Sequence, residues 1–314
     1  MLDAQKLKQK LLKYNTPRRI VQVLSFIFFG AVVFNLGALP LLFPVLWTWG
    51  LRTNTVGDAF TALQIALGGW NAASVVFPWL AVASFLIAGV LVGKALCGWV
   101  CPFGFVQDVV GYFRRKQSDL SARTHETMIY LKYLVLGVTL FVSIAYAASR
   151  LMGSGDAFRN AVGVFSEAPF TALSPSETLF ATLPRLILGF RFALAEKPAV
   201  DAIAGISTLP ALFWAQFVIM VIVLIFAVYV PRSWCRYLCP HGAIMAIMNR
   251  FSFIGLRREP FKCAKGQCRE CVQVCPTRVP ILDLPWEKFS DPECIYCMKC
   301  ADACQNRAIR PTYP

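Results

Sequence analysis

The sequence predicts an all-α membrane protein that carries a small, cysteine-rich α+β domain at its C-terminus. Of its 314 residues, 57% are hydrophobic and only 15% are charged, a balance far from that of a soluble domain. Four apolar stretches approach the length that crosses a bilayer. Eight of the twelve cysteines lie in the last 52 residues, which sets this segment apart from the rest of the chain.

The apolar stretches predict four transmembrane helices, because about 20 apolar residues cross a hydrocarbon core of roughly 30 Å. They cover residues 20–47, 75–96, 128–148 and 211–230. The second stretch reaches this length if Lys94, near its end, extends its amine to the membrane surface. The first contains Pro40 and Pro44 and no small-residue cleavage site, so we do not interpret it as a cleaved signal.

The positive charges predict the orientation of these helices. Lys and Arg number 23 in the segments 1–19, 98–127 and 231–314, but only 6 in the segments 48–74 and 149–210. Both termini and the C-terminal domain are therefore expected on the cytoplasmic side of the inner membrane, where disulfides are not expected. Topology and anionic membrane lipid account for the net charge of +14, so the charge does not call for nucleic acid as a partner.

An internal repeat organises the membrane part. The stretch "GKALCGWVCPFG" (93–104) has a counterpart 138 residues later, "PRSWCRYLCPHG" (231–242). Further aligned pairs are Trp99 with Tyr237, Gly104 with Gly242, Val106 with Ile244, Val109 with Ile247 and Phe113 with Phe251. We expect two parallel pseudo-repeats about an axis along the membrane normal, each a pair of transmembrane helices followed by a short interfacial helix.

The C-terminal cysteines form two runs, "CAKGQCRECVQVCP" (263–276) and "CIYCMKCADAC" (294–304). In a two-cluster domain, three closely spaced thiolates bind one cubane and a fourth reaches the other, so two such runs predict two [4Fe-4S] clusters. We assign Cys263, Cys268, Cys271 and Cys304 to the first cluster, and Cys275, Cys294, Cys297 and Cys300 to the second. The pattern resembles that of bacterial two-cluster ferredoxins, whose clusters carry single electrons.

Two departures from the ferredoxin pattern leave alternatives open. Four residues separate Cys263 from Cys268 where the pattern has two, and Gln305 follows the second run where the pattern has proline. The spacing of the first run alone would also suit a plant-type [2Fe-2S] cluster, although that pattern needs a distant fourth cysteine and has no second complete run. Zinc is the structural alternative, with knuckles that normally contribute two ligands each.

The paired cysteines at the membrane ends form a separate candidate metal site. They are Cys97, Cys101, Cys235 and Cys239. Proline disfavours helical geometry in the preceding residue and suits the first turn of a helix, so we expect a cysteine turn followed by helices that begin at Pro102 and Pro240. Three interpretations remain: a third iron–sulfur centre, redox-active dithiols or a Cu(I) site, and inert helix ends.

Taken in order, "CGWVCPFG", "CRYLCPHG" and the two C-terminal runs make the chain resemble the NapH family of membrane iron–sulfur proteins, which is related to the membrane halves of NosR and to the CcoG oxidoreductases. The resemblance implies a membrane domain over residues 1–255 and a ferredoxin-like domain over 256–314. It also implies a quinol dehydrogenase component of anaerobic or alternative respiration, in a hetero-oligomeric complex with an iron–sulfur protein, cytochrome or reductase. The alternative is an assembly factor, like CcoG, that delivers electrons to reduce copper.

Candidate groups for a quinone follow from this resemblance. His241, opposite Phe103 in the repeat, would hydrogen-bond a quinone or a cluster sulfur, or is an ordinary interfacial histidine. The segment 180–194 of the second outer loop favours a helix on the outer surface, which packs on the bundle or contributes to a quinone pocket or partner surface. The outer acids Asp156, Glu167 and Glu177 are candidates for proton handling, or solvated loop acids.

Overall fold

The computed structural model describes most of the chain. The described residues are 14–29, 48–49, 56–57, 79–113, 121–166, 169, 174–183, 186–187, 211–263 and 268–313. The chain divides into two compact units, and each is treated by itself below. The first comprises Met1–Phe28, Leu86–Tyr133 and Ala227–Pro314, and the second comprises Phe29–Phe85 and Leu134–Phe226.

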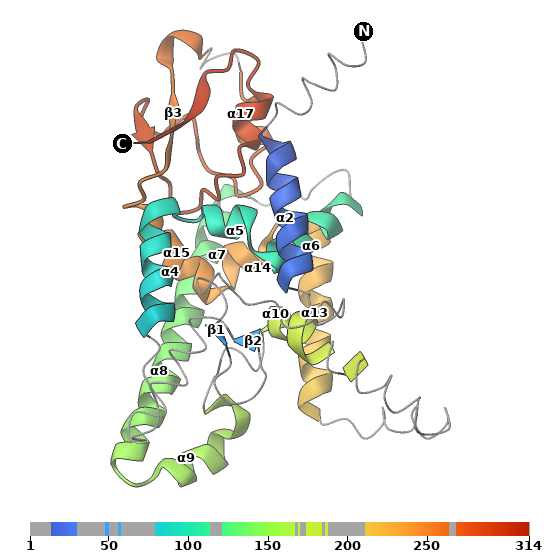
Figure 1. The fold of residues 1–314 in the computed structure, drawn as a ribbon, viewed down its shortest axis with the longest axis vertical. Helices are drawn as coiled ribbons and strands as arrows, with labels where there is room; N and C mark the ends of the chain where they lie inside the picture. Colours follow the sequence, from blue (N-terminus) through green and yellow to red (C-terminus); the bar gives the residue numbers. More distant parts are fainter. Residues whose placement is uncertain are drawn as a thin grey trace, which may run out of the picture. The chain divides into compact units, whose positions relative to one another are not determined.

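Helices form in each of the four stretches that were predicted to cross the membrane (Figure 1). They are α2 (Asn15–Phe29), α4 (Trp79–Val92), α8 (Leu131–Leu151) and α13 (Ala211–Tyr229). Within the described residues, the helical stretch Arg123–Leu151 is long and apolar enough to cross a membrane, and Phe213–Tyr229 is apolar but shorter. Much of the first predicted span, residues 20–47, lies outside the described residues.

The second unit also holds several short elements. They are β1 (Thr48–Trp49), which pairs antiparallel with β2 (Val56–Gly57), α9 (Gly155–Val162), η2 (Gly163–Phe165), α10 (Pro175–Glu177) and η4 (Thr178–Thr182). Asp156 lies in the first turn of α9, whereas Glu167 lies outside the described residues, as do the side chain of Glu177 and most of the predicted surface helix 180–194.

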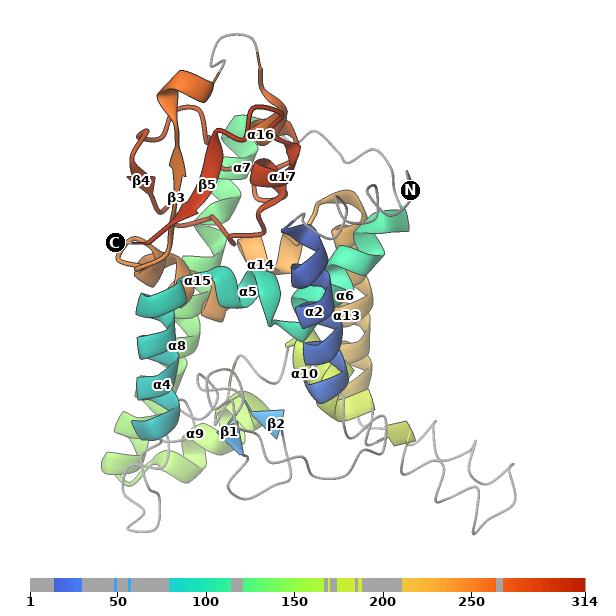
Figure 2. The same ribbon diagram turned by 45° about the horizontal axis from the view of Figure 1, so that its top comes forward.

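The first unit contains the two cysteine motifs, and their local structures match. Short helices α5 (Ala95–Trp99) and α14 (Ser233–Tyr237) hold the first cysteine of each motif, and α6 (Pro102–Val110) and α15 (Pro240–Asn249) follow (Figure 2). The predicted helix starts at the two prolines are confirmed. The expected cysteine turn is instead a short helix, and the second cysteine of each motif, with a non-helical ψ of 115° or 118°, is the residue directly before the next helix.

Two further helical segments connect to these motifs in the first unit. They are η1 (Gly111–Phe113), directly after α6, and α7 (Ala122–Ile129), whose N-terminus is capped by the Ser121 hydroxyl. α7 places His125, a residue that the sequence analysis did not single out, in the interior of the unit.

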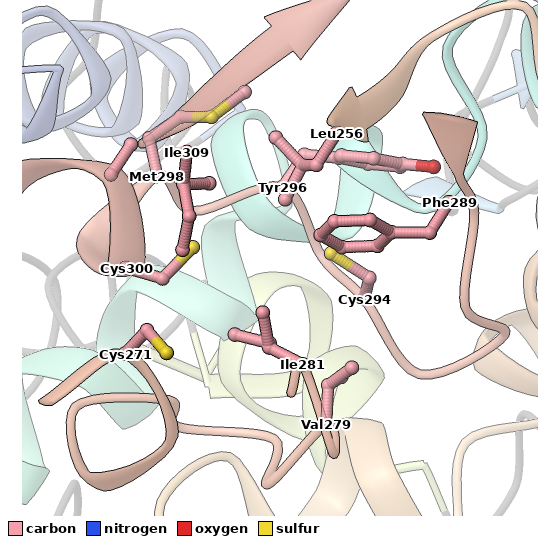
Figure 3. Close-up of a cluster of buried hydrophobic side chains, with 11 residues drawn as sticks. Leu256, Cys271, Val279, Ile281, Phe289, Cys294, Tyr296, Met298, Cys300 and Ile309 are labelled. Atoms are coloured by element: carbon pink, nitrogen blue, oxygen red, sulfur yellow. The ribbon is translucent and has the colours of Figure 1, made fainter. Parts of the chain in front are cut away.

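The C-terminal part of the first unit is a small α+β domain, as predicted. Its antiparallel sheet has the order β4-β3-β5 and is accompanied by short helices (Figure 1). These elements are β3 (Gly255–Arg258), η5 (Pro260–Lys262), α16 (Glu270–Gln273), β4 (Lys288–Phe289), α17 (Lys299–Ala303) and β5 (Ile309–Thr312). Leu256, Phe289 and Ile309 of the sheet pack with Ile281 and Tyr296, so apolar burial holds the sheet against the cysteine-bearing loops (Figure 3).

Candidate iron–sulfur sites

The four membrane-end cysteines converge within the first unit. The thiols of Cys101 and Cys235 are hydrogen-bonded to one another, and the thiol of Cys97 lies within electrostatic range of Cys235 and Cys239. Burial and the neighbouring Cys235 raise the pKa of the Cys97 thiol to about 12. We call these four residues the four-cysteine site. It draws its members from two motifs that lie far apart in the chain.

Two glycines let each motif fold tightly back on its own first cysteine. A Cβ added to Gly104 would lie 3.0 Å from the carbonyl oxygen of Cys97, and one added to Gly242 would lie 2.7 Å from that of Cys235. Only glycine accommodates such a close backbone approach without a shift. The two aligned glycines are therefore required for the same reason in both halves: the backbone passes too close to the first cysteine for a side chain.

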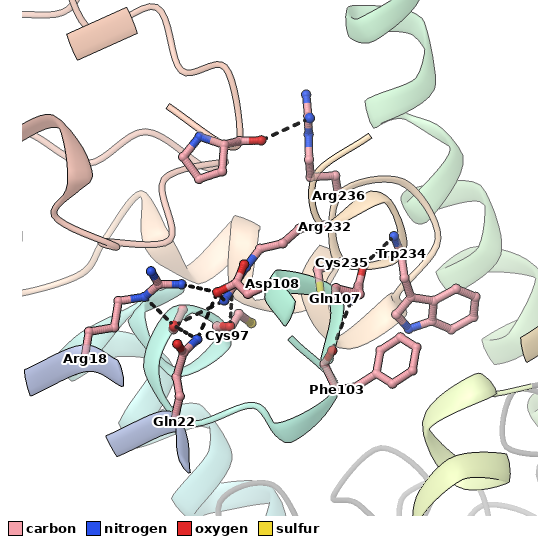
Figure 4. A network of polar contacts seen from close by, with 12 residues as sticks. Arg18, Gln22, Cys97, Phe103, Gln107, Asp108, Arg232, Trp234, Cys235 and Arg236 are labelled. Atoms are coloured by element: carbon pink, nitrogen blue, oxygen red, sulfur yellow. Dashed lines mark hydrogen bonds and ion pairs between the residues drawn. The ribbon is translucent and has the colours of Figure 1, made fainter. Parts of the chain in front are cut away.

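A buried cation accompanies the second motif. Arg232 lies three residues before Cys235, and its guanidinium donates to both Asp108 oxygens at 2.8 Å and to the Cys97 carbonyl at 2.6 Å (Figure 4). Arg18 of α2 is ion-paired with the same carboxylate. Although burial would raise the pKa of Asp108, the charges of Arg232 and Arg18 hold it well below its usual range.

The repeat places another buried cation before the first motif. Lys94, three residues before Cys97, donates from Nζ to Glu293 Oε2 at 2.8 Å, and Lys132 donates to the other oxygen of the same carboxylate. Both lysine side chains are at most 1% exposed. The expectation that Lys94 reaches the membrane surface is therefore wrong, because a carboxylate of the C-terminal domain meets it inside the protein.

Each buried group thus combines two cations with one carboxylate. We call Lys94, Lys132 and Glu293 the lysine triad, and Arg18, Arg232 and Asp108 the arginine triad. With its members ionised, each triad carries one formal positive charge, and a buried charge without a counter-charge is strongly destabilising. Lys94 and Arg232 act to lower the pKa of the Cys97 thiol, although burial and the neighbouring cysteines outweigh them, so these buried cations and the four sulfur donors suit an anionic metal centre.

A second polar contact supports the same site. The Gln107 amide of α6 donates to the Cys235 sulfur at 3.2 Å, while its oxygen accepts from the Trp234 backbone N–H at 3.1 Å (Figure 4). Hydrogen bonds to ligand sulfurs orient the ligands of iron–sulfur centres and set their potential. Gln107 is a positioning group that the cysteine spacing did not reveal.

In the C-terminal domain, one cavity gathers the cysteines that were predicted to bind the second cluster. We call Cys275, Cys294, Cys297 and Cys300 the inner set, and all four line this cavity together with Leu256, Thr277, Val279, Ile281, Ile295, Tyr296 and Met298. Tyr296 and Met298 have positive φ values of 47° and 59°, so the chain turns sharply between successive cysteines. A mostly apolar cavity lined by four thiols fits a cubane cluster.

The cysteines predicted for the first cluster also lie near one another. We call Cys263, Cys268, Cys271 and Cys304 the outer set. Burial raises the pKa of the Cys271 thiol, and the other three members raise it further, in the order Cys263, Cys268 and Cys304. Cys268 is exposed, whereas three members of the inner set are buried.

The two cysteine runs end in the same backbone turn. The Val279 N–H donates to the Cys275 sulfur at 3.4 Å, and the Ala308 N–H donates to the Cys304 sulfur at 3.3 Å. The arginine before each donor, Arg278 or Arg307, has positive φ. Gln305 therefore does not disturb the turn, although the ferredoxin pattern has proline at this position.

A histidine cluster lies beside the second motif. His125 Nδ1 and the Tyr237 hydroxyl are 2.9 Å apart, and Arg236 Nη2 donates to the same imidazole nitrogen at 2.9 Å. Burial and the positive charges of Arg236 and Arg278 lower the pKa of His125 to about 4. His241, in the first turn of α15, is half-buried, and its cofactor role remains a prediction.

Single-ion sites were a separate possibility. Within the part of the chain that the structure describes, no three His, Cys, Asp or Glu side chains are close enough to hold one metal ion.

A protein-family profile described as a 4Fe-4S binding domain matches the chain twice, over residues 74–118 and 212–259. The two matches begin 138 residues apart, which is the period of the repeat. Each contains one of the two cysteine motifs and the helix before it. The profile therefore links the membrane-end motifs with iron–sulfur proteins, whereas the C-terminal runs lie outside both matches.

Three relatives show the range of similarity. YccM of Escherichia coli (strain K12) is 24% identical over 229 residues, which are 72% of this chain and 52% of YccM. The ferredoxin-type protein NapH of the same organism is 24% identical over 256 residues, 79% of this chain and 72% of NapH. The regulatory protein NosR of Stutzerimonas stutzeri is 25% identical over 208 residues, 65% of this chain and 22% of NosR.

The chain thus spans about half the length of YccM and a smaller part of NosR. No solved structure matches the chain. The relatives and the repeated profile match support the resemblance that the motifs predicted, together with iron–sulfur clusters and an electron-transfer role.

Proposed function

Because the chain is similar to the NapH/NosR-like iron–sulfur proteins, we propose that it is a membrane-bound electron-transfer subunit that passes electrons between the quinone pool and a partner redox protein. The observation that carries this proposal is the convergence of the four-cysteine site next to the cysteine-rich C-terminal domain. Iron–sulfur clusters move single electrons, which is the chemistry that they would supply here.

The inner and outer sets would hold one [4Fe-4S] cluster each, and the four-cysteine site would hold a third iron–sulfur centre. The cavity that the inner set lines and the N–H groups that point at Cys275 and Cys304 support the first assignment. The lysine and arginine triads support the second, because the charges of Lys94 and Arg232 act to lower the pKa of the Cys97 thiol, against the burial that raises it.

Four membrane crossings, with both termini and the C-terminal domain on the cytoplasmic side, complete the proposal. Large apolar side chains on α8 and α13 are more than half exposed, as expected for helix faces in lipid. They include Leu134, Phe141, Ile222 and Ile225. Near the ends of the interfacial helices, the aligned residues Phe113 and Phe251 are 83% and 73% exposed, which suits burial among lipid headgroups.

The proposals that the protein uses quinone and works with a redox partner rest on the family resemblance. His241 is the residue that we propose for hydrogen bonding to a quinone, since it opens α15 beside the four-cysteine site. A domain boundary between residues 255 and 256 remains part of the proposal, with the two domains joined by the Lys94–Glu293 ion pair. The partner would be an iron–sulfur protein, a cytochrome or a reductase in a hetero-oligomeric complex.

Iron and sulfide analysis tests the cluster assignments. Protein purified without oxygen is expected to contain about twelve irons per chain, since each cubane holds about four. The variant Cys101→Ala should lose about four of them, whereas the control Thr127→Ala, at an exposed position of α7, should lose none. About eight irons in the unmodified chain would exclude the third cubane, and a preparation that holds zinc alone would exclude the cluster proposal entirely.

Quinol oxidation tests the proposed activity. Reduced menaquinol or ubiquinol analogues are expected to bleach the cluster absorbance of the chain in lipid nanodiscs, alone or with its copurifying partner. If neither analogue reduces the clusters in either preparation, the quinol proposal fails. Reduction of Cu(II) by the isolated reduced chain, without any effect of quinol, would favour an assembly role instead.

A further inference from the structure

The first cysteine motif lies directly against the loop that carries the inner set. A Cβ added to Gly98 would lie 2.1 Å from the carbonyl oxygen of Ile295, a distance that no side chain tolerates without movement. Gly98 lies between Cys97 and Cys101, and Ile295 follows Cys294. The absence of a side chain at Gly98 is what allows the two cysteine-bearing segments to touch through their backbones.

A hydrogen bond reinforces the same contact. The Trp99 indole Nε1 donates to the Tyr296 carbonyl oxygen at 2.8 Å, and both residues are the direct neighbours of the pair just described. Tyr296 is buried, has positive φ and lies between Cys294 and Cys297. The indole therefore meets the backbone at the sharp turn between two cysteines of the inner set.

The second motif reaches the same set from its other side. Arg236, between Cys235 and Cys239, donates from Nη1 to the Pro276 carbonyl at 3.1 Å (Figure 4). Pro276 directly follows Cys275, the inner-set member that comes from the first run. Both motifs thus contact backbone adjacent to inner-set cysteines, although these cysteines come from different runs.

The outer set has a different environment. In the outer set Cys268 is exposed, Cys263 and Cys304 are partly exposed and only Cys271 is buried. In the inner set Cys294, Cys297 and Cys300 are buried and only Cys275 is partly exposed. Electron transfer between redox sites requires that the sites lie close together. The inner set contacts both cysteine motifs and is the more buried set, so it is the set better placed to exchange electrons with the four-cysteine site.

We propose that the inner-set site is the electron-transfer neighbour of the four-cysteine site, and that Gly98 and Trp99 are the positioning residues of this junction. The order of sites is then the four-cysteine site, the inner set and the outer set, with the outer set, the more exposed of the two, at the end that faces a partner. One electron passes between neighbouring sites, and no covalent bond forms or breaks. This inference rests on the proposed function, because it assumes a redox centre in the four-cysteine site.

Magnetic coupling between the reduced sites tests the order. The full chain in lipid nanodiscs is reduced with dithionite as the electron donor, and its electron paramagnetic resonance spectrum is recorded with the iron content. Spin–spin broadening of the four-cysteine signal is expected to disappear in Cys294→Ala and to persist in Cys268→Ala. The reverse pattern, or broadening that is unchanged in both variants, overturns the inference.

The junction itself is tested with a matched pair of glycine variants. In Gly98→Ala the broadening should weaken while the iron content stays the same, because the new methyl group pushes the Ile295 backbone away. In the control Gly111→Ala the nearest atom would lie 3.9 Å from the new Cβ, so the spectrum should not change. Equal spectra for the two variants, at full iron content, contradict a junction at Gly98.

Trp99→Phe provides a second test if Gly98→Ala does not fold, since it keeps an aromatic side chain and removes the hydrogen bond to Tyr296. A smaller loss of broadening is expected there, and an unchanged spectrum counts against the proposal. The iron count separates a failure of the proposed site order from a failure of the proposed third centre. About twelve irons with the reverse coupling pattern overturn the site order alone, whereas about eight irons overturn the third centre and the junction with it.

Discussion

The two cysteine motifs have the same backbone but different neighbours. Both place a cysteine in a short helix, a second cysteine as the cap of the next helix, and a glycine against the first cysteine. Between the cysteines the residues differ: Gly98 and Trp99 contact the C-terminal domain at Ile295 and Tyr296, whereas Arg236 contacts it at Pro276 and Tyr237 contacts a histidine. The positions that shape the turn are therefore shared, and those that face outward from the site differ between the two halves.

The cations before the motifs show the same division. Lys94 and Arg232 occupy aligned positions, and each binds one buried carboxylate. The partner of Lys94 comes from the C-terminal domain, but the partner of Arg232, Asp108, comes from the interfacial helix of the first half. The repeat thus conserves a positive charge within the molecule, while the acid that balances it is supplied by different elements.

Removing the acid of the arginine triad should have the largest effect on stability. Asp108→Asn leaves Arg18 and Arg232 buried without a counter-charge, and we expect a loss of about 3–5 kcal/mol in the free energy of unfolding. Denaturant unfolding in detergent measures this, with Glu293→Gln as the equivalent change in the lysine triad.

Glu259→Gln is the control for this comparison, because Glu259 pairs with exposed cations and its removal should change the stability little. If Asp108→Asn is as mild as this surface variant, the arginine triad is not a structural unit.

The aligned glycines should show a smaller and graded effect. Gly242→Ala would bring a Cβ within 2.7 Å of a backbone oxygen and Gly104→Ala within 3.0 Å, so we expect losses of about 1–3 kcal/mol, the greater one at Gly242. Thermal unfolding compares both with Gly111→Ala, where the new Cβ would lie at an ordinary contact distance, 3.9 Å, from its nearest atom. Stability equal to that control at both positions would argue against a tight turn around the cysteines.

The stability should depend on pH through the histidine that contacts the second motif. His125 has a pKa of about 4 in the folded protein because of burial and nearby arginines, against about 6.5 when unfolded. Between these values the unfolded chain binds the additional proton, so stability is lost as the pH falls from about 6.5 to about 4. When the free energy of unfolding is measured across this pH range, its dependence on pH should be weaker in His125→Gln than in the unmodified protein. An equal dependence in the two proteins would be inconsistent with a neutral buried imidazole.

The aligned aromatic residues should contribute least. Tyr237→Phe removes the hydrogen bond with His125, and Trp99→Phe removes the bond to the Tyr296 carbonyl. Each should cost about 0.5–1.5 kcal/mol, which melting curves resolve. The two variants should have similar stability but different electron paramagnetic resonance spectra, since of these two residues only Trp99 lies at the proposed junction. A spectral change in Tyr237→Phe alone would reverse this comparison.

Local patterns in the sequence predicted much of the molecule. The prolines after each cysteine pair predicted where α6 and α15 begin, because proline fixes its own φ and restricts the residue before it. The repeat predicted that the two motifs share a backbone arrangement, as the glycines after each cysteine pair show. The spacing of the runs predicted which four cysteines line the inner cavity, although their ligand role stays a prediction. These are properties of short segments, which the chain itself encodes.

The contacts that only the tertiary structure decides join distant residues. Lys94 and Glu293 are 199 residues apart, Lys132 and Glu293 are 161 apart, and His125 and Tyr237 are 112 apart. Nothing local marks Lys94 as a buried residue, because a lysine at a helix end is equally compatible with a side chain that reaches the membrane surface. The sequence by itself determined the cysteine motifs and their turns. The fold decided which charge balances each motif and which cysteine set lies against both, because these depend on packing between distant segments.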